Sequence, residues 1–500
     1  MSRLVSLQLG APALVPEWAP WAVAAAVALY AAYIAVYLLL QRRSPHATLA
    51  WLLLLAFLPG LGLFFYYLLG LRVAGRRRRR QRAQSAVTAR GEQDPGVDRP
   101  EALGLPPQAC ALVRLIERAV GPSAALRPGR PRLLLSGAEK YAAVEEALQG
   151  ARHHAHLEYY IWEPDKVGAR LRDILVERAR DGVAVRVLVD GFGSLNAKRR
   201  FWRPLQDAGG RVARFSPAFF RRWTPRMANF RTHRKVILVD GQVAFTGGMN
   251  VSEVHDARHA GEDAWRDTHL RLTGLACHGL QMVFLEDWYY ATGEGPRGHV
   301  YFPLGEDGQP EPAAGTAGVP VQVVPSGPDE QQLRGTHGLF FSGITSSLQR
   351  VLLTSAYFVP DEPLLEALMS AAQRGVDVRV IVPKQGDVPV VAAAARSYFL
   401  DLVRAGVRVF EYPHPVLHAK SLVVDDWLAY VGSANFDNRS LRLNFEVGCA
   451  IYDPGVCAEL AEAFLRDEAR SHRVEGRELL RDPFRRRLMQ ATARLFAPLL

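Results

Sequence analysis

The feature that most constrains this 500-residue chain is an internal duplication of its polar motifs. A histidine, a lysine and an aspartate recur with the spacing H-x-K-x4-D, and an asparagine follows each histidine by 17 residues (250 − 233 and 435 − 418). The first copy is His233, Lys235, Asp240 and Asn250, and the second is His418, Lys420, Asp425 and Asn435. Two related halves that share one site are the simplest interpretation.

The residues before each motif repeat a second pattern of strand, helix, glycine and strand. In the first half these segments are 156–165, 171–179, Gly182 and 183–190, and in the second half they are 351–361, 364–374, Gly375 and 376–383. A glycine commonly ends a helix, and a helix between two strands forms a βαβ unit. The pattern predicts an α/β fold of two repeats, each a mostly parallel sheet flanked by helices, packed as a pseudo-twofold pair.

Two long apolar stretches precede the repeats. Residues 18–41 and 47–71 contain no charged side chain, and a helix that crosses a bilayer needs about 20 apolar residues. We therefore expect two transmembrane helices, although Pro59-Gly60-x-Gly62 interrupts the second stretch, so that a re-entrant segment is the alternative. Seven arginines follow within 72–82, against Arg42 and Arg43 in the short loop, which predicts that the repeats lie on the cytoplasmic side.

Composition suggests both the domain boundaries and the kind of partner. We expect a membrane anchor at 1–75, a basic flexible linker at 76–108, a first repeat at 109–292, a Gly/Pro-rich loop at 293–318, a second repeat at 319–480 and a basic amphipathic segment at 481–500. The net charge of +11 favours an anionic partner, either nucleic acid or an anionic membrane surface. The four cysteines form no C-x-x-C pair, so we expect reduced thiols and no zinc site.

The paired motifs suit chemistry at a phosphodiester. Histidine and lysine two residues apart on a strand point to the same face, whereas Asp240 and Asp425 point away and are expected to support a hairpin turn. One imidazole can attack phosphorus and the other can transfer protons, while the lysines and asparagines hold the non-bridging oxygens. The sequence is symmetric in this respect and does not decide which histidine is the nucleophile.

Further acids and one hydroxyl follow the motifs. Asp267 and Glu446 are candidates for fixing the tautomer and orientation of the two histidines. Ser433 stands where the first copy has Gly248, so a serine contact to phosphate is available on one side only.

H-x-K-x4-D is the signature of the phospholipase D superfamily. Residues 436–447, the approach Tyr412-x-His414 and the run 265–267 resemble bacterial cardiolipin synthases, and so do the apolar N-terminal segments, over essentially the whole chain. The resemblance implies that two phosphatidylglycerol molecules are joined into cardiolipin with release of glycerol. It also implies a phosphohistidine at His233, with His418 as general acid and base, and a place in the bacterial inner membrane with no metal, other cofactor or nucleic acid required.

Alternatives to this reaction remain open from the sequence. A hydrolase of the same superfamily would use water as the acceptor, and the motifs do not separate it from a transferase. A lipid-binding scaffold with a decayed site is disfavoured because His, Lys and Asn are intact in both copies. The basic, aromatic run 221–231 is either a headgroup contact or an exposed loop, and the C-terminal segment either lies on the membrane or packs on the domain.

Overall fold

The computed structural model describes residues 16, 18–41, 45–66, 100–215, 231–295, 298–303, 318–328 and 335–499. Its contacts divide the chain into an N-terminal unit, up to residue 74, and a body that holds most of residues 75–500. The arginine run at 72–82, most of the predicted linker and residues 221–230 lie outside the described residues.

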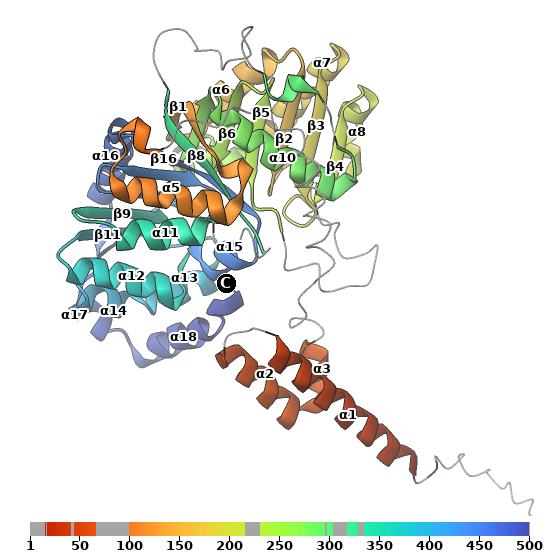
Figure 1. Cartoon of the computed structure of the whole chain (residues 1–500), viewed down its shortest axis with the longest axis vertical. Coiled ribbons are helices and arrows are strands. Elements are labelled where there is room, and N and C mark those ends of the chain that lie inside the picture. Colours follow the sequence, from red (N-terminus) through yellow and green to blue (C-terminus); the bar gives the residue numbers. More distant parts are fainter. Residues whose placement is uncertain are drawn as a thin grey trace, which may run out of the picture. The chain divides into compact units, whose positions relative to one another are not determined.

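The described residues of the N-terminal unit form the helices α1 (Trp18–Leu40), α2 (Pro45–Phe57) and α3 (Pro59–Phe65) (Figure 1). Among the described helices, α1 alone is long and apolar enough to cross a membrane. The second predicted span is divided at Leu58, whose backbone (φ −135°, ψ 66°) leaves the helical region because Pro59 crowds the residue before it. Gly62 lies against α2, where a Cβ would come within 2.8 Å of the Leu54 carbonyl oxygen.

The first repeat alternates strands and helices as its sequence predicts. Its elements are β1 (Leu126–Leu134), α6 (Gly137–Gln149), β2 (His154–Tyr159), α7 (Lys166–Arg180), β3 (Ala184–Asp190), α8 (Arg199–Asp207), β4 (Arg211–Phe215), β5 (Lys235–Val239), β6 (Val243–Gly247), α9 (Ala257–Ala260), β7 (His269–Thr273) and α10 (Ala276–Thr292). Asp165 caps α7 by accepting from the Gly168 amide, and Gly182, at φ 87°, follows the end of that helix.

The second repeat follows the same order with a few additions. Its elements are β8 (Val319–Ser326), α11 (Gly335–Thr345), β9 (Arg350–Ser355), β10 (Phe358–Val359), α12 (Glu362–Gln373), β11 (Asp377–Pro383), α13 (Pro389–Arg396), α14 (Phe399–Arg404), β12 (Arg408–Tyr412), β13 (Lys420–Val424), β14 (Leu428–Gly432), β15 (Phe436–Asp437), α15 (Asn438–Arg442), β16 (Glu446–Ile451), α16 (Pro454–Ala469), β17 (His472–Arg473), α17 (Gly476–Leu480) and α18 (Phe484–Leu495). Asp361 caps the start of α12 and Gly375 follows its end, as Asp165 and Gly182 do for α7.

Both motifs form the hairpins that the sequence predicts, β5–β6 and β13–β14. The prediction of mostly parallel sheets is wrong. Within the 15-stranded sheet, the parallel neighbours among the described strands are β2–β3, β3–β4, β9–β11 and β11–β12. The βαβ pattern covers only these strands, whereas each hairpin and the strands beyond it add antiparallel neighbours.

The two repeats form one continuous sheet in which β1 pairs with β8. From that junction outward the order is β7-β6-β5-β2-β3-β4 on one side and β16-β14-β13-β9-β11-β12 on the other, which places matching strands at matching positions. A buried core that includes Leu270 and Leu272 from the first repeat and Val447 and Cys449 from the second joins them.

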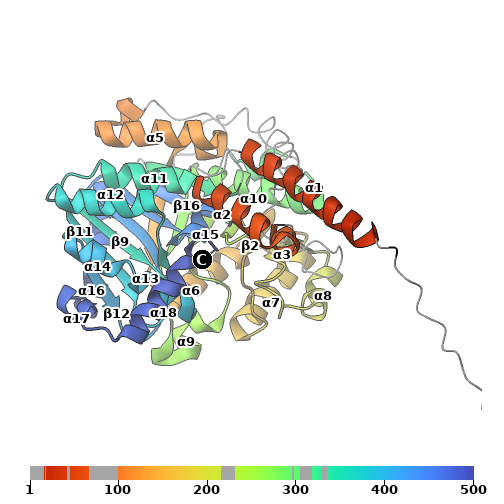
Figure 2. The same ribbon diagram turned by 90° about the horizontal axis from the view of Figure 1, so that it is seen from below.

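An additional helix, α5 (Pro107–Val120), precedes β1. Its sequence position lies at the start of the predicted first repeat, but its apolar face, including Leu112 and Ile116, packs into the core of the second repeat beside α11 (Figures 1 and 2). The chain therefore crosses from one repeat to the other before β1 begins.

Candidate active site

His233 stands just before β5, held by residues of the other repeat. Its backbone N–H donates to the Phe445 carbonyl at 2.8 Å, and its Nδ1 lies 3.0 Å from Glu446 Oε2. Phe445 and Glu446 belong to the second repeat, at the start of β16. The first histidine is therefore positioned by the second repeat.

His418 has the reciprocal arrangement. Its backbone N–H donates to the Arg266 carbonyl at 2.7 Å, and its Nδ1 lies 2.7 Å from Asp267 Oδ2. Both histidines were expected on strands together with their lysines. They instead lie on short segments before β5 and β13, because these segments pair in parallel with the backbone that precedes the opposite acid (Thr232 with Phe445, Leu417 with Arg266).

Burial favours the neutral form of both imidazoles. His233 is 8% exposed, and burial, aided by Lys235 and opposed by Glu446, lowers its pKa to about 4. Burial and the neighbouring Lys420 likewise lower the pKa of His418 against the opposing effect of Asp267. A neutral imidazole whose Nδ1–H donates to a carboxylate has a free lone pair on Nε2, which is the form required of a nucleophile.

The two acids remain ionised beside these rings. Burial raises the pKa of Asp267, but Lys420 and His418 together lower it below the usual range. Glu446 is also buried, and its pKa is lowered because His233 and Lys235 outweigh the effect of burial. Two carboxylates thus lie beside two lysines in a largely buried site.

Lys235 and Lys420 begin β5 and β13 and are almost completely buried. The Nζ of Lys235 donates to the His233 carbonyl at 2.7 Å, and Lys420 makes the same bond to His418. Burial lowers the pKa of Lys235 to about 7 and that of Lys420 to about 8. Both ammonium groups therefore gain from an anionic ligand such as a phosphate.

Asn250 and Asn435 follow the hairpins and are 5% and 2% exposed. Within the described residues, the Oδ1 atom of each has no hydrogen-bond partner. An unpaired buried amide oxygen is costly and only accepts, so each Oδ1 is available to a ligand hydroxyl, whereas a phosphate oxygen would have to be held by the Nδ2–H donors of the same side chains. The backbone of Asn250 is fixed by Lys140 and Tyr141, which donate to its carbonyl at 2.9 and 2.8 Å.

Ser433 and Gly248 differ for a steric reason. The Ser433 hydroxyl donates to Glu446 Oε2 at 2.5 Å and accepts from the Val447 amide at 3.0 Å, so it supports the carboxylate that holds His233. At Gly248 a Cβ would lie 2.1 Å from Asp267 Oδ1, which leaves no room for a side chain. Asp267 Oδ1 accepts from the Thr268 amide instead.

Asp240 and Asp425 lie away from the histidines, at the turns of the hairpins, with φ of 54° and 51°. The Asp240 carboxylate accepts from the backbone amides of residues 152–154, each at 2.8 Å, and Asp425 does the same for residues 348–350 at 2.8–2.9 Å. Each aspartate thereby ties its hairpin to the beginning of the neighbouring strand, β2 or β9.

We predict that Asp425→Ala lowers the free energy of unfolding by about 2–4 kcal/mol, because three amides lose a charged acceptor and alanine is strained at positive φ. Asp425→Asn, which tolerates that backbone, should cost less. Thermal unfolding followed by fluorescence measures both changes. The rate per folded molecule should stay within about threefold of the parent, since a supporting residue acts through the fold; a catalytic loss without destabilisation would contradict this role.

Several residues near the histidines were not predicted from the sequence as part of the site. The Tyr160 ring lies edge-on to His233 at 4.9 Å between centroids, and Trp265 and Tyr357 lie 5.3 and 6.4 Å from His418. Between His233 and Lys235, the buried Arg234 donates to the Glu446 carbonyl at 3.0 Å and pairs with Asp287. Tyr160 and Tyr357 each follow the first strand of a βαβ unit closely, which is the one pattern that could have identified them.

His255 lies beside the second histidine. Its Nε2 accepts from the backbone N–H of Asn250 at 3.3 Å, and its Nδ1 is 4.0 Å from Asp267 Oδ2. His255, Asp267 and His418 offer ligand atoms within 4.8 Å of one another, a spacing that a metal ion could use. Lys420 Nζ lies 2.9 Å from His418 Nδ1 and places a competing positive charge next to this group. The arrangement therefore suits an anion better than a divalent cation.

Comparisons with known proteins agree with this geometry. A family model described as cardiolipin synthase, PLD-like domain, matches residues 144–258 and 341–468, and a phospholipase D-nuclease N-terminal model matches 26–70. The chain is 38% identical to a cardiolipin synthase of Geobacillus thermodenitrificans over 94% of its length and 92% of that protein's. It is 33% identical to cardiolipin synthase 1 of Bacillus cereus over 93% and 92% of the two chains.

A solved structure shares the fold. The phosphatidylserine synthase of Haemophilus influenzae superposes with a TM-score of 0.57 at 16% identity, over 75% of this chain and 97% of that one. At this low identity the likeness shows the fold alone.

Proposed function

The chain belongs to the bacterial cardiolipin synthases of the phospholipase D superfamily, and we propose that it transfers a phosphatidyl group between two phosphatidylglycerol molecules through a phosphohistidine. The observation that carries the mechanism is the pair of buried imidazoles, each bonded through Nδ1 to a carboxylate of the opposite repeat. Two such rings can serve one phosphorus atom, one as nucleophile and one as acid and base.

In the first step, Nε2 of His233 attacks the phosphorus of the donor lipid. The bond from phosphorus to the glycerol headgroup oxygen breaks, and that oxygen takes a proton from His418, so that free glycerol leaves. Lys235, Lys420, Asn250 and Asn435 hold the non-bridging oxygens while charge develops on them. Burial lowers the pKa of His418, and the arriving phosphate anion favours its protonated form.

In the second step, the terminal hydroxyl of another phosphatidylglycerol attacks the same phosphorus. His418 accepts the hydroxyl proton, the bond from phosphorus to His233 Nε2 breaks, and cardiolipin is released. His418 has regained the proton that it gave to the first leaving group, and it releases this proton to solvent when the phosphate departs with the product, so the free enzyme returns to its starting state. No step needs an oxidant, a reductant or a nucleotide.

The membrane arrangement is part of the proposal. The apolar α1, with α2 and α3 as a kinked second pass, would anchor the protein in the inner membrane, with the repeats on the cytoplasmic side. The α18 helix exposes Phe484, Leu488 and Leu495 beside Arg485–Arg487, which suits an anionic membrane surface. The domain boundaries predicted from the sequence and a pseudo-twofold relation between the repeats, which the mirrored strand order supports, belong to the same proposal.

Incubation of the purified protein with phosphatidylglycerol vesicles tests the reaction. The expected products are cardiolipin and free glycerol in equal amounts. Phosphatidic acid without cardiolipin would instead identify a hydrolase in which water is the acceptor. Vesicles that mix phosphatidylglycerol with phosphatidylethanolamine identify the preferred donor through the headgroup released, which is glycerol or ethanolamine.

The pKa values of the site predict a bell-shaped pH dependence of kcat/KM. The rate should rise as His233 loses its proton around pH 4, because only neutral Nε2 can attack phosphorus. It should fall as His418, the general acid, loses its proton below the ordinary histidine pKa, and it should fall further as Lys235 and Lys420 lose theirs around pH 7 and 8, because the phosphate then loses two cations. Initial rates over this range measure both limbs. A kcat/KM that keeps rising through the pKa values of both lysines would contradict their proposed role.

A further inference from the structure

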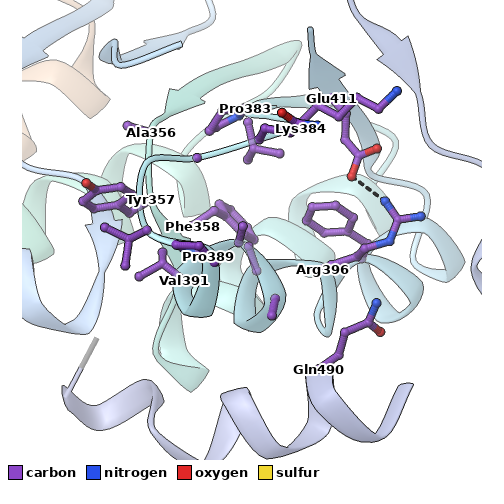
Figure 3. Close-up of a pocket in the computed structure, with 18 of the residues that line it drawn as sticks. Ala356, Tyr357, Phe358, Pro383, Lys384, Pro389, Val391, Arg396, Glu411 and Gln490 are labelled. Carbon is purple, nitrogen blue, oxygen red and sulfur yellow. Dashed lines mark hydrogen bonds and ion pairs between the residues drawn. The ribbon is translucent and has the colours of Figure 1, made fainter. Parts of the chain in front are cut away.

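A cavity of about 460 Å³ lies in the second repeat (Figure 3). It sits where the parallel strands β9, β11 and β12 end, and α13 and α18 contribute the remaining walls. The carboxyl edge of parallel strands is the usual place for a ligand in an α/β sheet. No step of the proposed mechanism uses this cavity.

The interior of the cavity is mainly apolar. Phe358, Val382, Val391 and Phe399 are buried around it. Its inner charges are already satisfied, because Arg396 bonds Glu411 at 2.5 Å and Asp482 at 3.4 Å (Figure 3). An anionic headgroup would find no free cation in this part of the cavity, whereas a hydrocarbon chain would find a matching surface.

The opening of the cavity is amphipathic. Lys384, just beyond the end of β11, is exposed, and Arg486 and Met489 come from α18. Met489 is 56% exposed although it lines the cavity, and Phe484 and Leu488 on the same helix are exposed as well. Arg486 pairs with Asp482 at 3.2 Å, which leaves the exposed Lys384 as the cation that would meet a lipid phosphate. An apolar slot with an exposed lysine at its mouth is complementary to a lipid that joins acyl chains to an anionic phosphate.

Tyr357 lies between the cavity and His418. Its ring lines the cavity and also stands edge-on to His418, at 6.4 Å between centroids. Its hydroxyl donates to the Asp387 carboxylate at 2.8 Å, which fixes the ring between the cavity and His418. The cavity therefore adjoins His418, the histidine that handles the leaving and incoming hydroxyls in the proposed mechanism.

Displacement at phosphorus requires the attacking and leaving atoms to lie roughly in line. With His233 on one face of the phosphorus, the incoming lipid must approach from the face next to His418. We propose that the cavity holds an acyl chain of the acceptor phospholipid, with Lys384 at its mouth near the acceptor's own phosphate. This inference rests on the proposed transfer between two lipids and specifies where the second lipid binds.

Filling the cavity tests the proposal. Ala392→Trp places a large ring inside it, while Val390→Trp puts the same ring on the exposed face of α13, outside the lining residues. We expect Ala392→Trp to lower kcat/KM for dioleoyl phosphatidylglycerol by about tenfold or more, because several chain methylenes lose their apolar site. Dihexanoyl phosphatidylglycerol, whose short chains depend less on the cavity, should react within about twofold of the parent rate, as should both lipids with Val390→Trp.

An equal loss for both chain lengths, or no loss, would overturn the acyl-chain assignment. Photolabelling of the unaltered full-length protein decides the matter if Ala392→Trp fails to fold. Phosphatidylglycerol with a photoactivatable group at the end of an acyl chain should label residues 388–399 or Phe358, and labelling confined to the N-terminal helices would overturn the proposal. Parent protein that makes no cardiolipin would refute the transfer reaction itself, whereas an active parent with an unaffected Ala392→Trp variant refutes only the cavity.

Discussion

His233→Ala is expected to abolish the phosphoenzyme and to lower the rate of cardiolipin formation by about 10⁵-fold, as removal of a covalent nucleophile does elsewhere. His233 contacts Glu446 through Nδ1 and Tyr160 through its ring, and alanine retains neither contact nor the Nε2 atom that attacks phosphorus. The measurement uses phosphatidylglycerol with a radiolabelled phosphate, quenched in denaturant at a pH that preserves phosphohistidine. Label should remain on the parent protein and be absent from the variant.

The His418→Ala variant separates the role of the nucleophile from that of the general acid and base. It should slow both steps by about 10²–10⁴-fold, since proton transfer contributes that much, yet leave the nucleophile in place. A donor with a good leaving group, which needs no proton, should still label this variant and should not label His233→Ala. His259→Ala, at an exposed histidine of α9, is the matched control and should behave as the parent does. Label on His233→Ala but not on His418→Ala would reverse the assignment.

The sequence predicted the repeated units because their pattern is local. Each strand, helix, glycine and hairpin is encoded within about 30 residues, and β5–β6 and β13–β14 appear where the motifs place them. The strand directions beyond the βαβ units depend on contacts between distant segments, so the mostly parallel sheet was predicted wrongly. The packing of α5 on the second repeat also depends on contacts between distant segments, because no local signal identifies the partner of this helix.

The site was predictable in its components but not in its connections. Asp267 and Glu446 were candidates from position alone, and either acid could have served either histidine. The structure joins residues that are 213 and 151 positions apart, so that each repeat completes the other's histidine. The same fact explains why neither half offers a complete site: a single repeat has an imidazole without its carboxylate.

This crossed arrangement predicts which acid governs which histidine. Glu446→Gln and Asp267→Asn should each lower the transfer rate by about 10²–10⁴-fold, because an amide cannot hold the Nδ1–H tautomer or stabilise an imidazolium as a carboxylate does. The change is nearly isosteric, so the fold should be retained, and Glu459→Gln on the exposed face of α16 is the control. Glu446→Gln should in addition slow formation of the phosphoenzyme, because it acts on the nucleophile.

Proton NMR of the imidazole rings tests the pairing independently of rate. An Nδ1–H bonded to a carboxylate resonates far downfield, and the two resonances can be assigned from the two histidine-to-alanine variants. Glu446→Gln should remove the resonance of His233 and leave that of His418, and Asp267→Asn should do the opposite. Loss of the His418 resonance in Glu446→Gln would mean that each acid serves the histidine of its own repeat. The two halves would then be separate sites, and one phosphorus atom could not be passed from a lipid to His233 and on to an acceptor activated by His418.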